Sequence, residues 1–206
     1  MHSAMRVGVD LDNTLIRYDY LFHQVACEMG LIGRQTHRTK KDVKRAVLDR
    51  HDNDIWTELQ GIVYGERLAG AEPYPGALDF FRACFERSMP VAIISHKSRL
   101  PAKGPQVDLR EAALCWLDAQ GWFEQTAGGL SLSNVEFCET RCDKVAAIAR
   151  RNCTDFIDDL PEVFSEPDFP LSVNQYLFDP DNHHTKWEGG EHCRSWAELT
   201  SRFFKE

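Results

Sequence analysis

The sequence predicts an α/β fold, a Rossmann-like parallel sheet with helices on both faces plus a small helical cap insertion. The first observation is an alternation of short apolar runs with helical patterns, which is typical of a parallel sheet covered by crossover helices. The second is that the runs Val7–Val9 and Val91–Ile94 are entirely apolar apart from one glycine, as in strands buried on both faces. The third is a long helical interval that interrupts this alternation after the first run.

The expected elements follow one another along the chain in a regular order. The expected strands are Val7–Val9, Val91–Ile94, Asn134–Phe137, Phe156–Ile157 and Tyr176–Phe178. Helical patterns lie between most of them, at residues 77–87, 109–119 and 144–151. This order predicts one α/β domain built from residues 1–17 and 74–206.

Residues 18–73 are expected to form the helical cap. Thr39 with Asp42 three residues later resembles a capping box that opens a helix. Asp54 is expected to cap a second helix, with Gly70 near its end. An inserted cap of this kind excludes water and bulky substrates from a site that it covers, which favours a small ligand.

Composition narrows the classes of partner. The chain has 206 residues, with 24 Lys and Arg against 32 Asp and Glu and a formal net charge of −8. Such an acidic chain repels nucleic-acid backbones at long range, so nucleic acid is an unlikely partner. Seven dispersed cysteines, without a signal-peptide pattern or a long apolar run, predict a cytoplasmic protein with reduced thiols and no membrane segment. Oligomeric state is not predicted.

Polar residues follow the expected strands at the point where each strand ends. Asp10 with Asp12 follows the first strand, Ser95 follows the second, and Asp158 with Asp159 follows Phe156–Ile157. One aspartate after a strand is usually a turn former or a helix cap. In an open parallel sheet, however, ligands bind beyond the carboxyl ends of the strands. Converging carboxylates need a cation, and oxygen ligands of this kind suit Mg²⁺.

The same residues carry a family resemblance. Residues 10–15, Asp-Leu-Asp-Asn-Thr-Leu, resemble the DxDxT signature of the haloacid dehalogenase-like (HAD) hydrolase superfamily. The family's second motif, a strand ending in Ser or Thr, is matched at Ser95, and its third, a lysine near a helix start, at Lys144. Its fourth, an acidic pair after a strand, is matched by Asp158 and Asp159. The ordered set resembles the phosphatase branch with a helical cap between the first and second motifs.

The resemblance implies a role for each acid. Asp10 would be the nucleophile that forms an aspartyl-phosphate. Asp12 would protonate the leaving oxygen and later deprotonate the attacking water, while its backbone carbonyl would help Asp10 bind Mg²⁺. Asp158 would be a direct metal ligand, and Asp159 would support the metal or its waters.

Further residues would complete the catalytic set by the same resemblance. Lys144 would supply a fixed cation, and the Ser95 hydroxyl would donate a hydrogen bond to the transferring phosphoryl group. Thr14 would hold the loop after the nucleophile and is also a candidate substrate-binding residue. As the family is understood, dehalogenases lack the second aspartate, so Asp12 favours a Mg²⁺-dependent phosphomonoester hydrolase acting on a small soluble phosphorylated metabolite.

Three other functions stay open. A phosphotransferase or phosphomutase would use the same residues, and a polynucleotide end phosphatase would need cations facing the site. A non-catalytic metal- or phosphate-binding module is the third alternative. Residues 34–50 hold seven cations, which form either a surface for an anionic substrate or a solvated helix face.

The loops that follow the strands offer further substrate contacts. His96 and Lys97 directly follow Ser95 and are candidate substrate-binding residues, although simple loop duty is the alternative. His183 follows the last expected strand and is a candidate pocket residue. The spacing of the histidines near it fits no standard zinc motif.

Overall fold

The computed structural model describes residues 5–204, and its contacts divide the chain into two compact units. Unit 1 comprises Met1–Leu15, Pro73–Lys97 and Gln120–Glu206. Unit 2 comprises Ile16–Glu72 and Ser98–Ala119.

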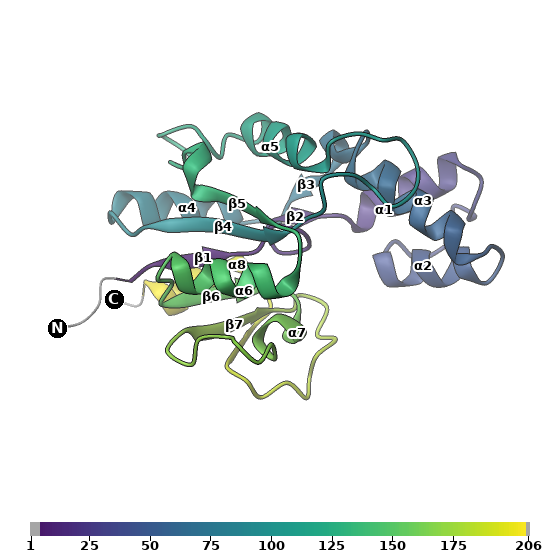
Figure 1. Cartoon of the computed structure of the whole chain (residues 1–206). Helices are drawn as coiled ribbons and strands as arrows, with labels where there is room; N and C mark the ends of the chain where they lie inside the picture. The colour runs from purple at the N-terminus through teal and green to yellow at the C-terminus, as the bar shows by residue number, and fades with distance from the viewer. Residues whose placement is uncertain (1–4, 205–206) are drawn as a thin grey trace. The chain divides into compact units, whose positions relative to one another are not determined.

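Unit 1 is built on a six-stranded sheet in the order β5-β4-β1-β6-β7-β8 (Figure 1). Its strands are β1 (Val7–Val9), β4 (Val91–His96), β5 (Val135–Cys138), β6 (Asp155–Asp158), β7 (Asn174–Phe178) and β8 (Glu191–Cys193). Each of the five neighbouring pairs is parallel. The predicted fold class, a Rossmann-like parallel sheet with helices around it, is therefore confirmed. The edge strand β8 was not predicted, because three residues with two polar side chains give no strand pattern.

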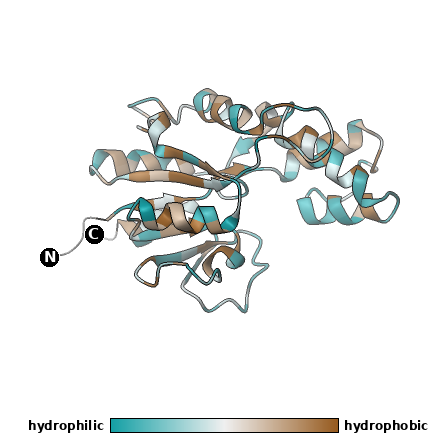
Figure 2. Cartoon of the chain, in the orientation of Figure 1, coloured by the Kyte–Doolittle hydropathy of each residue, from teal (hydrophilic) through white to brown (hydrophobic). Residues whose placement is uncertain are grey.

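The central strands pack closely because their side chains are small or fully buried. Val7, Gly8 and Val9 are all buried and pair with both β4 and β6. A Cβ atom placed on Gly8 would lie 2.5 Å from the ring of Phe156 on β6, so only glycine fits there. Figure 2 shows hydrophobic colour along these strands, as expected for a sheet covered on both faces.

Helices cover both faces of the sheet in unit 1. They are α4 (Ala77–Glu86), α6 (Arg141–Arg150), α7 (Pro161–Phe164) and α8 (Trp196–Phe203), with a short 3₁₀ helix at Leu132–Asn134. Leu177 of β7 packs in one cluster with Val145 of α6 and Val163 of α7. The next residue, Phe178, points to the opposite face and lies 5.7 Å from the ring of Trp196 on α8. A hydrophobic core therefore lies on each face of the sheet.

Unit 2 is helical, and its first segment comprises residues 16–72, where the sequence predicted a cap over residues 18–73. Its elements are α1 (Asp19–Glu28), α2 (Lys40–Leu48), α3 (Asn53–Tyr64), a 3₁₀ helix at Leu68–Gly70 and α5 (Leu109–Ala119), and a two-stranded sheet joins β2 (Ile16–Arg17) to β3 (Glu72–Pro73). Aromatic rings form its core: Phe22 stacks on Trp56 at 5.2 Å, and Tyr64 meets Phe22 edge-on at 5.6 Å.

Helix α5 belongs to unit 2, although the sequence placed residues 98–119 in the α/β core. Trp116 of α5 donates its indole N–H to the carbonyl oxygen of Ala71 at 2.9 Å, and this side chain is buried. A segment distant in sequence thus completes the helical unit, and the hydrogen bond of Trp116 is one of the contacts that join it to residues 16–72.

The helix starts in unit 2 test the predicted caps. Thr39 caps α2 and accepts from the amide of Asp42 at 3.1 Å, which confirms the predicted helix start, while the Asp42 carboxylate accepts from the Thr39 hydroxyl at 2.7 Å. The prediction that Asp54 caps the next helix is wrong, because Asp52 is the cap and its carboxylate accepts from the amides of Asp54 and Ile55. That helix ends at Tyr64, well before Gly70.

Two further observations concern the whole described chain. All seven cysteines carry free thiols. Among residues 5–204, no helix is both long and apolar enough to cross a membrane.

Candidate active site

The candidate site lies where the strand order of the sheet reverses. The chain runs outward from β1 to β4 and β5, and then returns to place β6 on the other side of β1. Asp10 follows β1 directly, and Asp158 is the last residue of β6. The amide of Asp10 donates to the carbonyl oxygen of Ile157 at 2.9 Å, which extends the pairing of the two strands to the site. Such a switch point is where α/β sheets bind ligands.

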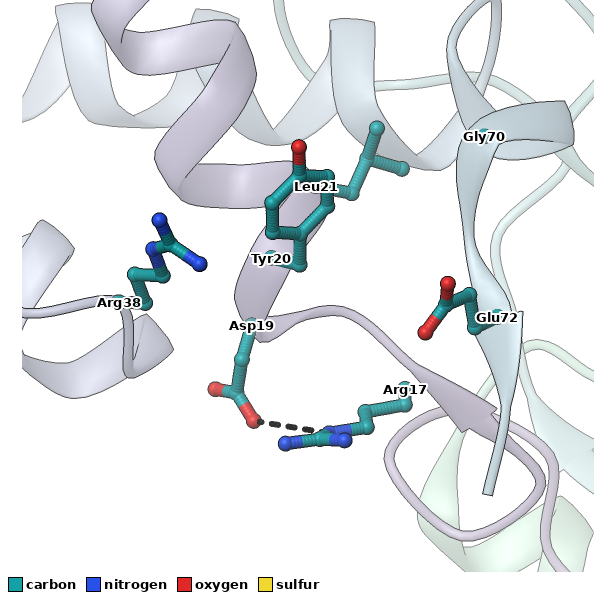
Figure 3. A pocket seen from close by; sticks show the side chains of 7 residues that line it. All are labelled: Arg17, Asp19, Tyr20, Leu21, Arg38, Gly70 and Glu72. Carbon is teal, nitrogen blue, oxygen red and sulfur yellow. Dashed lines mark ion pairs between the residues drawn. The ribbon is translucent and has the colours of Figure 1, made fainter. Parts of the chain in front are cut away.

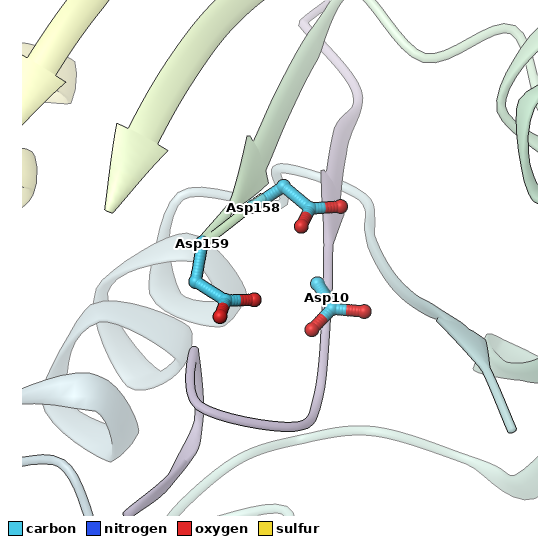
Figure 4. A group of neighbouring side chains, drawn as sticks. All are labelled: Asp10, Asp158 and Asp159. Atoms are coloured by element: carbon cyan, nitrogen blue, oxygen red, sulfur yellow. The ribbon is translucent and has the colours of Figure 1, made fainter. Parts of the chain in front are cut away.

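Three carboxylates converge at this point, as Figure 4 shows. One oxygen each from Asp10, Asp158 and Asp159 lies within 4.8 Å of the others. Asp158 is fully buried, and one of its oxygens accepts from the amide of Leu160 at 3.0 Å, which fixes the carboxylate. Hard oxygen donors at this spacing fit a small divalent cation such as Mg²⁺. We call these three side chains the carboxylate cluster.

Lys144 connects the first and the last acid of the predicted motifs. Its ammonium group donates to Asp10 at 2.5 Å and to Asp158 at 2.6 Å, and its side chain is 2% exposed. A capping box of Thr140 and Asp143 starts α6 and thereby places Lys144 in the first turn. Burial would lower the pKa of Lys144, but Asp10 and Asp158 outweigh burial and raise it, so the group is a permanent cation.

The electrostatics of Asp10 reflect its burial. Burial raises the pKa of Asp10, Lys144 lowers it, and the neighbouring charges of Asp158 and Asp12 raise it further, to about 7. The site holds four carboxylates, on Asp10, Asp12, Asp158 and Asp159, and two ammonium groups, on Lys144 and Lys97. When all six groups are ionised, their formal charge is −2. This surplus matches one divalent cation.

Asp12 lies outside the carboxylate cluster and pairs with Lys97. The Lys97 ammonium donates to both oxygens of Asp12, at 2.7 and 3.0 Å. The Lys97 side chain is 3% exposed, whereas that of Asp12 is 22% exposed. The sequence suggested Lys97 as a substrate contact, and the structure places its ammonium on the proposed general acid.

Ser95 and Thr14 are the remaining predicted site residues that are buried. Ser95 is the fifth residue of β4 and is buried, and among the described residues its hydroxyl oxygen has no hydrogen-bond partner. The Thr14 hydroxyl approaches Asp10 at 3.4 Å, while the Thr14 carbonyl accepts from the indole of Trp196 at 3.0 Å. Thr14 therefore ties the loop after Asp10 to α8.

The two histidines suggested as substrate contacts have local partners. The ring of His96 bonds to the carbonyl oxygen of Glu139 at 2.9 Å. The amide of His183 donates to Asp179 at 2.9 Å, and its ring lies 3.9 Å from Asp181. Their roles in substrate binding stay predictions.

Sequence reasoning did not single out Asp179, although it follows β7 as Asp10 follows β1. It is buried and accepts from the amides of His183 and His184 and from the ring of His192. Burial would raise the pKa of Asp179, but the amide of His184 and the other two donors hold it below its ordinary value. The strand-end rule that located Asp10 was the available signal. Asp179 anchors the loop beyond β7.

Unit 2 contains a polar pocket of about 260 Å³, shown in Figure 3. Its charged residues are Arg17, Asp19, Arg38 and Glu72, so the two cations are balanced by two anions. The guanidinium of Arg38 lies 5.6 Å from the ring centroid of Tyr20, which is 52% exposed.

Two of the cations between residues 34 and 50 lie close to aromatic rings in the folded chain. Lys40 lies 5.4 Å from the ring of Phe22, and Lys44 lies 5.8 Å from that of Trp56. Both rings are buried, so they offer no face on which a base could stack. The sequence pattern did not indicate this pairing, because the aromatic residues lie on α1 and α3 whereas the cations lie on α2.

A parallel α/β sheet with acids at its switch point defines a class of ligand-binding α/β proteins. More particularly, the fold is that of HAD-superfamily hydrolases. A dehalogenase solved with an intermediate complex matches with a TM-score of 0.62, 12% identity and 100% of each chain covered. A HAD hydrolase of family IA, variant 3, from Entamoeba histolytica matches with a TM-score of 0.60, 12% identity and 94% of each chain covered.

A third solved structure was determined with ligands. A HAD family hydrolase from Deinococcus radiodurans R1, with bound phosphate and sodium, matches with a TM-score of 0.57 and 17% identity over 96% of this chain and 94% of its own. At such identities the likeness establishes the fold. No family model and no curated protein matches the sequence.

Proposed function

We propose that this chain is a Mg²⁺-dependent phosphomonoester hydrolase that acts on a small soluble phosphorylated metabolite through an aspartyl-phosphate intermediate. The observation that carries the proposal is the carboxylate cluster with Lys144 bound to two of its members. Asp10, Asp158 and Asp159 would hold the metal, with the Asp12 carbonyl as a further ligand. When bound, the metal supplies positive charge against the phosphoryl oxygens.

The residues of the chain divide the reaction into two displacements. In the first, an oxygen of Asp10 forms a bond to phosphorus while the bond to the leaving oxygen breaks, and Asp12 gives that oxygen its proton. In the second, Asp12 takes a proton from water, and the water oxygen attacks phosphorus. The bond to Asp10 then breaks, which releases inorganic phosphate and restores both carboxyl groups.

Lys144 and Ser95 would stabilise the negative charge on the oxygens of the transferring phosphoryl group. Lys144 is permanently charged and touches the attacking carboxylate, so it is placed to neutralise phosphoryl oxygens near Asp10. The buried Ser95 hydroxyl has no hydrogen-bond partner among the described residues, which supports its use as a donor to substrate. Both assignments agree with the roles that the motifs suggest.

Dehalogenation is the rival that the comparisons raise, because some of the similar structures are dehalogenases. Displacement of a halide from carbon needs neither a proton donor for the leaving group nor a metal. In a dehalogenase, the carboxylate cluster and the ion-paired Asp12 would cost folding stability through desolvation and would contribute nothing to the reaction. These groups therefore favour phosphoryl transfer.

The test compares metal dependence and the nucleophile in one assay. With p-nitrophenyl phosphate, we expect release of inorganic phosphate with Mg²⁺ and none with chelator. Asp10→Asn should lower kcat by a factor on the order of 10³ or more, while Asp168→Asn, an exposed aspartate in unit 1, should match the wild type. Activity that persists with chelator or in Asp10→Asn would refute the mechanism.

A panel of substrates separates the remaining alternatives. A panel of sugar phosphates, nucleotides and phosphorylated acids, with a 2-chloro acid added, reports the substrate class and any halide release. Phosphate appearing on an added sugar rather than in solution would indicate a phosphotransferase or mutase. A preference for oligonucleotide ends that weakens steeply with salt would indicate a polynucleotide phosphatase. Mg²⁺ binding without turnover across the panel would indicate a binding module.

A further inference from the structure

The ion pair between Lys97 and Asp12 has an unusual geometry for a loop lysine. The ammonium group reaches both carboxylate oxygens, at 2.7 and 3.0 Å, and so fixes the rotation of the carboxylate as well as its position. The Lys97 side chain is almost fully buried, although lysine is rarely buried unless it is paired. The desolvation of Lys97 is therefore tied to this carboxylate.

The backbone holds Lys97 where this contact forms. Lys97 directly follows β4, and its amide donates to the carbonyl oxygen of Cys138 at 3.0 Å, at the end of β5. The base of the side chain thus belongs to the rigid sheet rather than to a freely moving loop. A side chain anchored at both ends confines Asp12 more tightly than a surface ion pair does.

Asp12 needs such confinement because its surroundings are negative. Asp12 lies two residues after Asp10, which belongs with Asp158 and Asp159 to the carboxylate cluster. The Asp12 side chain is 22% exposed, so solvent is open to its carboxylate when the Lys97 ammonium is removed. A proton donor must instead stay within hydrogen-bond reach of the leaving oxygen.

We propose that Lys97 is a positioning residue that holds the Asp12 carboxylate in one orientation, apart from the carboxylate cluster, for proton transfer at the leaving-group oxygen. This proposal rests on the proposed function. It assigns Lys97 no contact with substrate, in contrast to the role that the sequence suggested. Its effect on catalysis therefore passes entirely through Asp12.

The expected consequence is a loss in kcat that depends on the leaving group. Phenol is a poorer leaving group than p-nitrophenol, so hydrolysis of phenyl phosphate depends more on a positioned acid. In Lys97→Met, kcat for phenyl phosphate should fall by a factor on the order of 10², within the range of general acid catalysis. The fall for p-nitrophenyl phosphate should be several-fold smaller, with both KM values within twofold of the wild type.

A double-mutant cycle separates positioning from substrate binding. If Lys97 acts only through Asp12, Lys97→Met should cost nothing further in an Asp12→Asn background. A further loss there, or a raised KM in Lys97→Met, would show that Lys97 contacts substrate and would overturn the proposal. Lys97→Gln, which keeps one donor, should recover part of kcat. Lys103→Met removes another Lys–Asp ion pair, with Asp54 in unit 2, and should leave kcat unchanged.

A structural measurement keeps the proposal testable apart from activity. A crystal structure of Lys97→Met, or of Lys97→Gln if the first variant does not fold, should show the Asp12 carboxylate displaced or in several orientations. An Asp12 carboxylate unchanged from the wild-type crystal structure overturns the proposal. Wild-type protein that hydrolyses no phosphate ester refutes the proposed function instead, and the crystal structures then decide on the positioning role alone.

Discussion

Removal of the Lys144 charge is the sharpest test of the electrostatics of the candidate site. Lys144→Met keeps an unbranched side chain in the buried position but removes both hydrogen bonds, to Asp10 at 2.5 Å and to Asp158 at 2.6 Å. Both carboxylates stay buried, with side chains 7% and 0% exposed. The variant therefore leaves two adjacent negative charges without their shared cation.

The expected loss of stability in Lys144→Met follows from the burial of Lys144, Asp10 and Asp158. Removing one partner of a buried ion pair lowers the free energy of unfolding by about 3–5 kcal/mol, because the remaining charge has no compensation. For a chain of this size, each kcal/mol lowers the melting temperature by about 2–4 °C. We therefore expect Lys144→Met to melt roughly 6–20 °C below the wild type in chelator.

Differential scanning calorimetry at about pH 8 is the assay, since Asp10, with a pKa of about 7, is then ionised in the metal-free wild type. At about pH 5.5 Asp10 is protonated, so Lys144→Met should lose less stability there than at pH 8. Lys186→Met removes an exposed lysine in unit 1 and should change the free energy of unfolding by less than about 0.5 kcal/mol. Equal melting temperatures for the two variants at pH 8 would refute this reasoning.

Three smaller changes test other contacts. Asp179→Asn should lower the free energy of unfolding by about 1–3 kcal/mol at neutral pH, because three donors lose a charged acceptor. The folded-state pKa of Asp179 is depressed, so this stability is present above the unfolded-state pKa and is lost as pH falls through the folded-state pKa. Urea titrations of the variant and the wild type should therefore converge in acid, and a constant difference between them would contradict the assignment. Gly8→Ala should cost about 1–3 kcal/mol because a Cβ there lies 2.5 Å from the Phe156 ring, and an unchanged urea midpoint would count against this packing. Thr140→Ala removes the cap of α6 and should cost about 1 kcal/mol, whereas Thr140→Ser should not, as judged by hydrogen exchange of the first-turn amides.

The fold of unit 1 could be predicted closely because its strands carry their own signal. The predicted first strand matches β1 without a shift, and the predicted helix at residues 77–87 differs from α4 by one residue at its end. Buried parallel strands are apolar and their crossover helices are amphipathic, so local patterns record both. Strand β8 was not predicted, because its pairing with β7 depends on backbone hydrogen bonds and a three-residue polar segment shows no strand pattern.

The candidate site could be predicted in part for a similar reason. Asp10 follows β1 and Asp158 ends β6, and parallel strands present their carboxyl ends at one edge, so the strand pattern alone indicates that the two acids are neighbours. The partner of Lys97 could not be predicted in this way. Asp12 lies 85 residues earlier in the chain, and only the pairing of β1 with β4 brings the two side chains together.

Membership of the helical unit shows the same division. The pattern of residues 18–73 indicates helices, but nothing in residues 98–119 indicates that they pack with them, because the indole of Trp116 finds its acceptor at Ala71 only after folding. The sequence by itself determined the α/β class, the positions of the strand-end acids and the identity of the lysine in α6, because periodicity and chain order are local properties. Tertiary structure alone decided which charges pair, since the ion pairs of Lys144 and Lys97 join residues from α6, from β6 and from the segments that follow β1 and β4, and burial gives those pairs their strength.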